Sequence, residues 1–492
     1  MSYVLGIDIG TSGCKVTALD ESGDAVATVS REWFPIVRPN GTSEQDPQEW
    51  IDGVREAISE LSAGLDDSFG VKAIGVTGQM QGATFVDEAG TPVRPSILWN
   101  DTRSSPQTRE IIKGDRKRIE GIIGAPFSDG LTLGKLLWVR ANEPENWARL
   151  ATVLHAPEFI VQAITGQRLA DVNNLGQSGM NDVAANDWSY DLLDEFDIPR
   201  TMVPPVVACD EVAATTTETA AVIGLPAGIP VVCAGGDSGA EGFSLGLAGL
   251  PRLKVRLGTA ADLNLVRPYD PNRGGFRDVV PGHVLVGAYT KSCASSVRWV
   301  REMFFTDRPQ TTDTFAFMDA CTVDVPAGSD GLIFHPYLMG EATPYFNSAM
   351  SGMLHGLRAG MGRGHVTRAM YEGIAMSIRD ILDHTPDFAH TKEIVVLGGG
   401  AKSEVFVSSL VDVLGRDGIV PPHGDAAYGA ALLAGHTIGV WDGFERAAAN
   451  VAAGRRVAPD SERHAVLSEN YARYLADAQR EDARTAVDSE GS

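Results

Sequence analysis

The acidic residue Asp237 stands where a carboxylate could take part in catalysis. It follows the apolar run Pro230 to Ala234 and two glycines, and a helix is predicted to begin at Asp237 itself. A carboxylate at a helix N-terminus stays ionised because the helix dipole stabilises its charge. It could then accept the proton of an alcohol that attacks a phosphoryl group. The alternative is a plain helix N-cap, the commonest reason for an aspartate there.

Two turns of small residues have the composition of phosphate-binding loops. The first consists of Gly10, Thr11, Ser12 and Gly13, with Lys15 just beyond, and the second of Gly258 and Thr259. Glycines let backbone N–H groups converge on an anion, and hydroxyls add donors. Asp8 precedes the first turn and could hold a hydrated Mg²⁺ through its water shell. Ordinary hairpin turns remain the alternative, and neither turn matches the P-loop or the dinucleotide fingerprint.

Three further segments have residue types suited to a sugar or a nucleoside. A sugar needs fixed donors and acceptors for its hydroxyls and a flat apolar wall for its C–H face. Two clusters offer this: Trp99, Asn100, Asp101 and Arg103, and the loop Gln79, Met80 and Gln81. The run Gly399, Gly400 and Ala401 follows an apolar strand and could let adenosine lie flat against the backbone. Each segment also has an ordinary structural interpretation. The cluster at 99–103 could be a surface turn with an ion pair, and the loop at 79–81 a polar loop at a strand end. The run at 399–401 could serve tight packing between a strand and a helix.

The predicted elements that must position these residues follow one plan twice. Strands are predicted at 3–9, 15–19 and 25–29 as an antiparallel meander, then a helix from Asp46–Pro47 and a buried strand at 71–77. The second half repeats strand, Gly-Thr turn and strand, then a helix at 366–382 and a strand at 393–397. We therefore predict two α/β domains divided near 246–253, with a nucleotide clamped between them.

Composition excludes several classes of function. The chain has 492 residues and a formal net charge of −23, which argues against a nucleic-acid or anionic-membrane partner. No apolar run reaches about 18 residues, so no transmembrane helix is expected. The N-terminus lacks a basic region and does not resemble a signal peptide. Five scattered cysteines without a CxxC pair indicate reduced thiols in a cytoplasmic protein.

Taken in order along the chain, these segments resemble the FGGY family of carbohydrate kinases, and within it most closely the xylulokinases. The resemblance rests on the ordered set GIDIGTSGCK, GVTGQMQG, ILWNDTR, GLTLGKLLWVRANEP, AGGDSGA, RLGTAA, GEATPYFN with SGMLHGL, HVTRAMYEGIAMSIRD, VVLGGGAKS and DAAYGAALLAG. Single motifs of this kind are weak evidence, but the ordered set covers nearly the whole chain and is specific for the family.

The resemblance implies a fold, a reaction and roles for residues. The fold is α/β, with two ribonuclease H-like (actin-like ATPase) domains at 1–248 and 249–478, an interdomain catalytic cleft and an acidic tail at 479–492. The reaction is transfer of the ATP γ-phosphate, with Mg²⁺, to a sugar's primary hydroxyl. Asp237 would be the base and, with Asp8, would lie near the metal. The cofactor-binding set would be Gly10, Thr11, Ser12, Lys15, Gly258, Thr259, Gly399, Gly400, Ala401 and Ser403. The substrate-binding set would be Gln79, Met80, Gln81, Trp99, Asn100, Asp101, Arg103 and Asp237.

Three departures from the xylulokinase pattern leave the choice of sugar open. Gln81 stands where xylulokinases usually carry His, and an amide cannot titrate near neutrality. The run 155–159 replaces the usual Lys-Asp-Tyr, and 171–176 departs from a Ser/Ala-rich stretch. D-xylulose is the expected substrate; ribulose, erythritol, gluconate and glycerol remain alternatives, as do an actin-like ATPase and a non-catalytic sugar sensor. A homodimer is left open.

Overall fold

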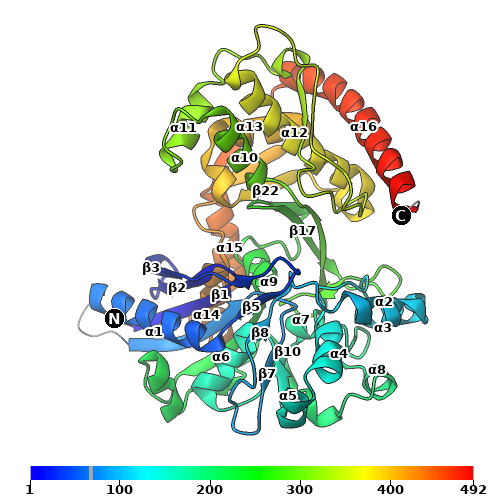
Figure 1. Ribbon diagram of the computed structural model, residues 1–492. Coiled ribbons are helices and arrows are strands. Elements are labelled where there is room, and N and C mark those ends of the chain that lie inside the picture. Colours follow the sequence, from blue (N-terminus) through cyan, green and yellow to red (C-terminus); the bar gives the residue numbers. More distant parts are fainter. Residues whose placement is uncertain (1, 66–69, 491–492) are drawn as a thin grey trace. The chain divides into compact units, whose positions relative to one another are not determined.

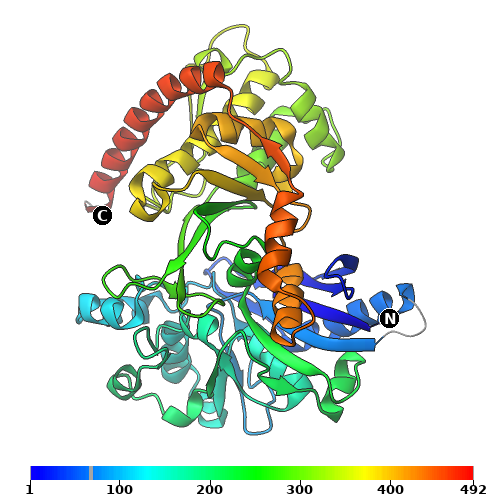
Figure 2. The same cartoon turned by 180° about the vertical axis from the view of Figure 1, so that it is seen from behind.

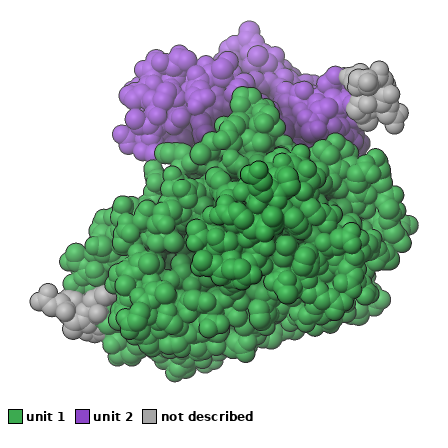
Figure 3. Space-filling view, turned by 60° about the horizontal axis from the view of Figure 1, so that its bottom comes forward, with its two compact units in different colours: residues 1–249, 266–285, 423–450 green, residues 250–265, 286–422, 451–492 purple. Residues whose placement is uncertain are grey.

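The computed structural model describes residues 2–490 apart from 66–69, and the chain divides into two compact units (Figures 1 and 3). Unit 1 comprises residues 1–249, 266–285 and 423–450, and unit 2 comprises residues 250–265, 286–422 and 451–492. Unit 1 therefore includes two segments from the second half of the chain. The functional division at 248/249 stays a prediction.

A six-stranded sheet forms the centre of unit 1, in the order β14-β15-β6-β1-β2-β3. Strands β1, β2 and β3 pair antiparallel, which confirms the predicted meander, while β6 is parallel to both β1 and β15. The strands are β1 (Ser2–Gly10), β2 (Gly13–Leu19), β3 (Ala25–Glu32), β6 (Gly70–Gly78), β14 (Ala214–Thr215) and β15 (Pro230–Gly236).

The two faces of this sheet are covered by different helices, and β1 shows which residues face which layer. Leu5, Ile7 and Ile9 pack in one core with α1 (Pro47–Gly64) and α6 (Ala156–Thr165). On the opposite face Gly6 contacts α14 (Ala426–Thr437), which also packs against α9 (Asp237–Ser244) (Figure 2). Because side chains alternate along a strand, Asp8 belongs to the face of α9 and α14.

Helix α14 approaches the sheet so closely that only glycine fits beneath it. A Cβ on Gly6 would lie 1.8 Å from the carbonyl oxygen of Ala427. We therefore expect Gly6→Ala to lower the free energy of unfolding by about 1–3 kcal/mol, because the helix must shift outward. Thermal unfolding followed by circular dichroism measures this effect.

The matched control is Gly121→Ala in α3 (Arg116–Ile123), where an added Cβ meets no heavy atom within 4 Å. This substitution should leave the melting temperature unchanged or raise it, since alanine favours the helical state. Equal melting temperatures for the Gly6→Ala variant and the wild type would contradict the close packing of α14.

The second large sheet repeats the plan of the unit 1 sheet, and most of its residues belong to unit 2; residues 266–268 and 283–285 are counted in unit 1. It contains β19-β17-β16-β22-β23-β24 in this order, with β16 and β17 antiparallel and β16, β22 and β23 parallel. The predicted duplication of structural pattern is thereby confirmed. The strands are β16 (Arg252–Leu257), β17 (Ala261–Pro268), β19 (His283–Thr290), β22 (Glu393–Leu397), β23 (Asp417–Val420) and β24 (Arg455–Val457).

Long helices complete unit 2. They are α10 (Ala294–Phe304), α11 (Asp313–Ala320), α12 (Arg363–His384), α13 (Glu404–Leu414) and α16 (Ser461–Glu490). The helix predicted at 366–382 lies inside α12, and the tail predicted at 479–492 begins inside α16, with residues 491–492 outside the described part. Across residues 2–65 and 70–490, no helix has the length and apolar character needed to cross a membrane.

Shorter elements between β6 and β15 build a third core of unit 1, next to the predicted sugar loops. One of them, β8 (Ser96–Ile97), pairs with β5 (Ser43–Gln45), which lies before β6 in the chain. The helices are α2 (Ser105–Lys113), α4 (Thr132–Asn142), α5 (Pro144–Arg149), α7 (Val172–Leu175) and α8 (Tyr190–Glu195). The short strands are β7 (Thr84–Val86), β9 (Thr152–Leu154), β10 (Ala170–Asp171), β11 (Asn181–Asp182) and β12 (Asp187–Trp188).

Candidate functional site

Asp237 is the first residue of α9, directly after the end of β15. The N-cap of this helix is Gly236, so Asp237 does not serve as the N-cap that the alternative interpretation required. One of its carboxylate oxygens accepts a hydrogen bond from the Ser238 N–H at 2.7 Å, and the residue is half-buried. A carboxylate in the first helical turn is stabilised as the anion and keeps contact with solvent.

The strand end that carries Asp237 is fixed by hydrogen bonds from neighbouring elements. The Thr77 hydroxyl donates to the carbonyl of Gly235 at 2.9 Å, and Gly235 has a φ of 73°, a conformation that favours glycine. The Gly236 N–H donates to Oδ1 of Asn173 at 2.8 Å. Nothing in the local sequence singles out Asn173, although it lies in a stretch that departs from the xylulokinase pattern.

Asp8 and Asp237 lie at the same edge of the unit 1 sheet. Asp8 on β1 is in register with Thr77 on β6, and Gly236 on β15 is in register with Gly78 on β6. Two strand spacings, about 10 Å, therefore separate the backbones that carry the two carboxylates. Both residues are half-buried, and strand alternation assigns Asp8 to the face where α9 begins.

This arrangement fits a sparsely coordinated Mg²⁺. Within the described residues, no group of three or more His, Cys, Asp and Glu side chains is gathered as a metal site. Mg²⁺ that accompanies a nucleotide needs only one or two protein carboxylates, because water and phosphate oxygens supply its other ligands. The Asp8 and Asp237 carboxylates fit that requirement, and their contact with a metal stays a prediction.

The Thr11 side chain joins the first phosphate turn to both predicted sugar loops. Its hydroxyl donates to Oε1 of Gln79 at 3.2 Å and accepts from the indole N–H of Trp99 at 3.0 Å. Gln79 in turn donates to Gln45 at 2.9 Å. Because the Thr11 hydroxyl already makes two hydrogen bonds within the protein, we expect backbone N–H groups of the turn and the exposed Ser12 to bind a phosphate.

Lys15 forms an ion pair within unit 1. Its Nζ lies 3.6 Å from Oδ2 of Asp425, and each side chain is about one third exposed. Asp425 is the N-cap of α14, where its carboxylate accepts the Tyr428 N–H at 3.0 Å. The Lys15 side chain therefore reaches the N-terminal end of α14, and its contact with a nucleotide stays a prediction.

The cluster at 99–103 separates into an exposed half and a buried half. Trp99 is 47% exposed and Asn100 is exposed, so an indole face and an amide are available to a ligand. The Asp101 carboxylate accepts the N–H of Ser43 at 2.6 Å and Nη2 of Arg103 at 2.7 Å. Arg103 also contacts Glu44 at 2.8 Å. These contacts fit a structural role for Asp101 and Arg103 beneath the exposed pair.

Met80 lies against the residue that precedes Asp237. A Cβ on Gly236 would lie 2.2 Å from Cγ and 2.4 Å from Sδ of Met80, so this thioether fills the space that a larger residue would need. Met80 and the Asp237 strand end are therefore neighbours, although 156 residues separate Met80 from Gly236 in the chain.

The three departures from the xylulokinase pattern are connected in space. Nε2 of Gln81 donates to Oε1 of Gln177 at 2.8 Å, just after the 171–176 stretch. The Thr132 hydroxyl donates to the Gln81 carbonyl at 3.4 Å and lies 3.1 Å from Nε2 of His155. Gln177 was missed from the sequence, because nothing local to it indicates that it meets position 81.

In unit 2 the second phosphate turn and the predicted adenosine turn lie side by side. They follow β16 and β22, adjacent parallel strands in which Arg256 pairs with Leu397. A Cβ on Gly398 would lie 2.7 Å from the Leu257 carbonyl oxygen, whereas a Cβ on Gly399 would meet no heavy atom within 4 Å. Gly399 therefore presents open backbone.

Several residues of these turns have structural partners in unit 2. The Ser403 hydroxyl caps α13 by accepting the Phe406 N–H at 3.1 Å, and Ala401 is 8% exposed. The Thr259 carbonyl accepts the N–H of Cys293 at 3.0 Å, while Thr259 itself is exposed. Gly399 and Thr259 are thus the more accessible of the predicted nucleotide-side residues.

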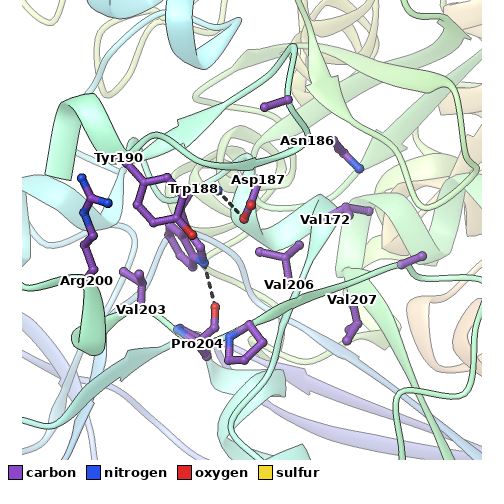
Figure 4. A pocket seen from close by; sticks show the side chains of 13 residues that line it. Val172, Asn186, Asp187, Trp188, Tyr190, Arg200, Val203, Pro204, Val206 and Val207 are labelled. Carbon is purple, nitrogen blue, oxygen red and sulfur yellow. Dashed lines mark hydrogen bonds between the residues drawn. The ribbon is translucent and has the colours of Figure 1, made fainter.

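A separate cavity of about 620 Å³ lies in unit 1 (Figure 4). Within it the Trp188 indole donates to the Pro204 carbonyl at 2.7 Å, and the Arg200 guanidinium lies 4.7 Å from the centre of the Tyr190 ring. None of the residues predicted to contact sugar or nucleotide is among the described residues that line this cavity.

Comparisons with known proteins agree with this arrangement. Residues 3–243 match the N-terminal domain, and residues 258–438 the C-terminal domain, of the FGGY family of carbohydrate kinases. The chain is 30% identical to a xylulose kinase of Lactococcus lactis, over 90% of both chains. It is 31% identical to one of Escherichia coli, over 87% of this chain and 89% of that protein.

The structure is also similar to that of a solved kinase. A xylulose kinase from Rhodospirillum rubrum is 27% identical, with a TM-score of 0.87 over 98% of this chain and all of the other. The two-domain actin-like ATPase fold is shared with it. The sheet plan, the paired turns and the matches along the chain agree, and the protein belongs to the FGGY family of carbohydrate kinases.

Proposed function

We propose that this ATP-dependent carbohydrate kinase phosphorylates the primary hydroxyl of D-xylulose to give D-xylulose 5-phosphate. The observation that carries the proposal is the identity of about 30% to xylulose kinases across about 90% of both chains. The position of Asp237, at a strand end next to Met80, supports it, because a base is needed beside the acceptor hydroxyl.

In the proposed reaction, residues of unit 1 hold the sugar and accept its proton. Trp99, Asn100 and the loop at 79–82 orient the sugar. The hydroxyl oxygen attacks the γ-phosphorus of ATP, its proton passes to the Asp237 carboxylate, and the bond to the bridging oxygen breaks to release ADP. The turn at 10–13, the turn at 258–259 and the turn at 399–401 each offer backbone N–H groups of the kind that bind phosphate or a nucleoside.

The finer features of the proposal concern the metal, assembly and location. Asp8 and Asp237 would hold Mg²⁺, which when bound offsets the negative charge of the phosphates. A homodimer is kept as a hypothesis. All five cysteines are free, which supports the prediction of a reducing, cytoplasmic location.

The proposal is tested by a substrate panel. The protein with Mg-ATP is offered D-xylulose, L-xylulose, D-ribulose, erythritol, gluconate and glycerol, and ADP release is followed. We expect the highest kcat/KM for D-xylulose. If D-xylulose is no better than several of the others, the specific assignment falls, and ATP hydrolysis that needs no sugar would overturn the kinase reaction itself.

A further inference from the structure

Asn174, in the short helix α7, is held in one fixed orientation beside the strand end that carries Asp237. Its backbone N–H and its Nδ2 each donate to the Asp171 carboxylate, at 2.8 Å. Because a carboxylate only accepts, the amide nitrogen must face Asp171, which places Oδ1 on the opposite side of the amide.

That oxygen is buried, and no described residue donates a hydrogen bond to it. Asn174 has no exposed surface, and its Oδ1 has no hydrogen-bond partner within the part of the chain that the structure describes. A buried polar atom without a partner is costly, so native proteins rarely keep one unless a ligand or water completes it.

The position of the oxygen indicates which ligand would complete it. Oδ1 of Asn174 lies 3.3 Å from the point that a Cβ on Gly236 would occupy, and Met80 flanks the same point. Gly236 directly precedes Asp237. The unpaired acceptor therefore lies where the predicted sugar loop and the predicted catalytic strand end meet.

The neighbouring Asn173 shows a different pattern. Its Oδ1 accepts the Gly236 N–H at 2.8 Å, and its Nδ2 donates to the Arg277 carbonyl at 2.5 Å. Both ends of the Asn173 amide are used within unit 1, so Asn173 fixes the backbone. Asn174 has one end left for a ligand.

We infer that Asn174 is a substrate-binding and specificity-determining residue, whose Oδ1 accepts a hydrogen bond from a hydroxyl of the sugar. The inference rests on the proposed function and adds a contact that the sequence motifs did not indicate. An acceptor at this point selects a ligand that offers a proton, which a neutral polyhydroxy sugar does through each of its hydroxyls.

The negative charge of the Asp171 carboxylate, which holds Asn174, strengthens the selection for an uncharged sugar. Burial and the nearby Glu158 charge raise the pKa of Asp171, while N–H donors from Asn173 and Asn174 favour its ionised form. An anionic sugar acid would be repelled from this place, whereas a neutral ketose would not. The substrate class that fits is an uncharged sugar with a free hydroxyl beside the reacting end.

The test compares Asn174→Ser and Asn174→Ala with the wild type at pH 8, with D-xylulose and with D-ribulose. Serine can still donate to Asp171 but has no acceptor atom at the position of Asn174 Oδ1, so it keeps the test valid if the alanine variant does not fold. We expect the KM for the sugar to rise about tenfold, with the KM for ATP unchanged and kcat within about threefold.

Asn181→Ser is the matched control. Asn181 is also buried, its Nδ2 donates to the Ile123 carbonyl at 3.0 Å, and its Oδ1 likewise finds no partner among the described residues. It belongs to none of the predicted sugar or nucleotide segments. It should alter stability but not the KM for the sugar, which separates a contact with substrate from a general packing defect.

The outcomes distinguish this inference from the proposed function. An unchanged sugar KM in both Asn174 variants, with active wild type, overturns the contact alone. A rise that Asn181→Ser reproduces also overturns it, because the effect would then be structural. A wild type that phosphorylates neither ketose overturns the proposed function and, with it, the inference.

A second experiment tests the selection against anions. The inhibition constant of D-gluconate against the wild type should be at least tenfold higher than the dissociation constant of D-xylulose. Equal constants would contradict the selection against anions.

Discussion

Replacing Asp237 by asparagine should lower kcat for sugar phosphorylation by about 10²–10⁴-fold, because an amide cannot accept the proton of the attacking hydroxyl. Asparagine keeps the shape of the side chain and can still accept the Ser238 N–H through Oδ1. The free energy of unfolding should therefore change by at most about 1 kcal/mol, the worth of a negative charge at a helix N-terminus. Initial rates of ADP release at saturating D-xylulose and ATP measure the effect.

The control for this substitution is Asp210→Asn, which removes the same charge from an exposed position of unit 1. It should retain wild-type kcat. Turnover in the Asp237→Asn variant within a few-fold of the wild type would remove Asp237 as the base. A loss of activity accompanied by unfolding would instead identify it as a structural residue, which circular dichroism distinguishes.

The second large effect is expected on stability, from the buried ionic cluster next to the sugar loop. The Glu44 carboxylate contacts Arg94 at 2.5 Å, Arg103 at 2.8 Å and Arg38 at 2.9 Å. The Glu44, Arg94 and Arg103 side chains are each less than 10% exposed. Burial raises the pKa of Glu44, but the hydrogen bonds from Arg38 and Arg103, with the Arg103 and Arg94 charges, outweigh it and lower the pKa to about 2.

Glu44→Gln should therefore lower the free energy of unfolding at pH 7 by about 3 kcal/mol, since it leaves buried guanidinium groups without their shared anion. The pKa of Glu44 is lowered in the folded state, from an ordinary value of 4.5. Its contribution is thus complete above pH 4.5 and is lost as the pH falls toward 2. Urea unfolding of both proteins between pH 7 and pH 2.5 should show the difference shrinking in that window.

Glu88→Gln is the corresponding control, because the Glu88 side chain is 94% exposed and its ion pair with Arg168 spans 4.0 Å. It should change the free energy of unfolding by less than about 1 kcal/mol at any pH. If Glu44→Gln is equally silent, or if its effect does not depend on pH below 4.5, the cluster does not stabilise the loop.

Much of the local architecture followed from sequence patterns. Asp46 and Pro47 predict the start of α1, and the structure confirms Asp46 as its N-cap, with the carboxylate accepting the Gln48 N–H. The strands that were predicted in the two sheets agree with the observed ones to within a few residues, whereas β14, β19, β23 and β24 were not predicted. These features depend on neighbours in the chain, through capping, alternation and helical periodicity, so sequence alone carries them.

Contacts between distant segments were beyond such patterns. The engagement of the Thr11 hydroxyl by Trp99 and Gln79 joins three segments that the sequence treats separately. The pairing of Gln81 with Gln177 and the free acceptor of Asn174 depend in the same way on which strand ends meet. No local rule of propensity or spacing specifies these partners.

By itself the sequence determined the main central strands of both halves, the duplicated plan and the segments that carry glycine turns and acids, because each follows from residues within one turn, helix or strand. Only the tertiary structure decided which of those side chains are free to meet a ligand. Burial committed the Asp101 and Arg103 side chains to partners within the protein, since a polar group removed from water must find a hydrogen bond. For Oδ1 of Asn174 the same requirement is unmet among the residues that the structure describes, and that is the physical reason to look for its partner in the substrate.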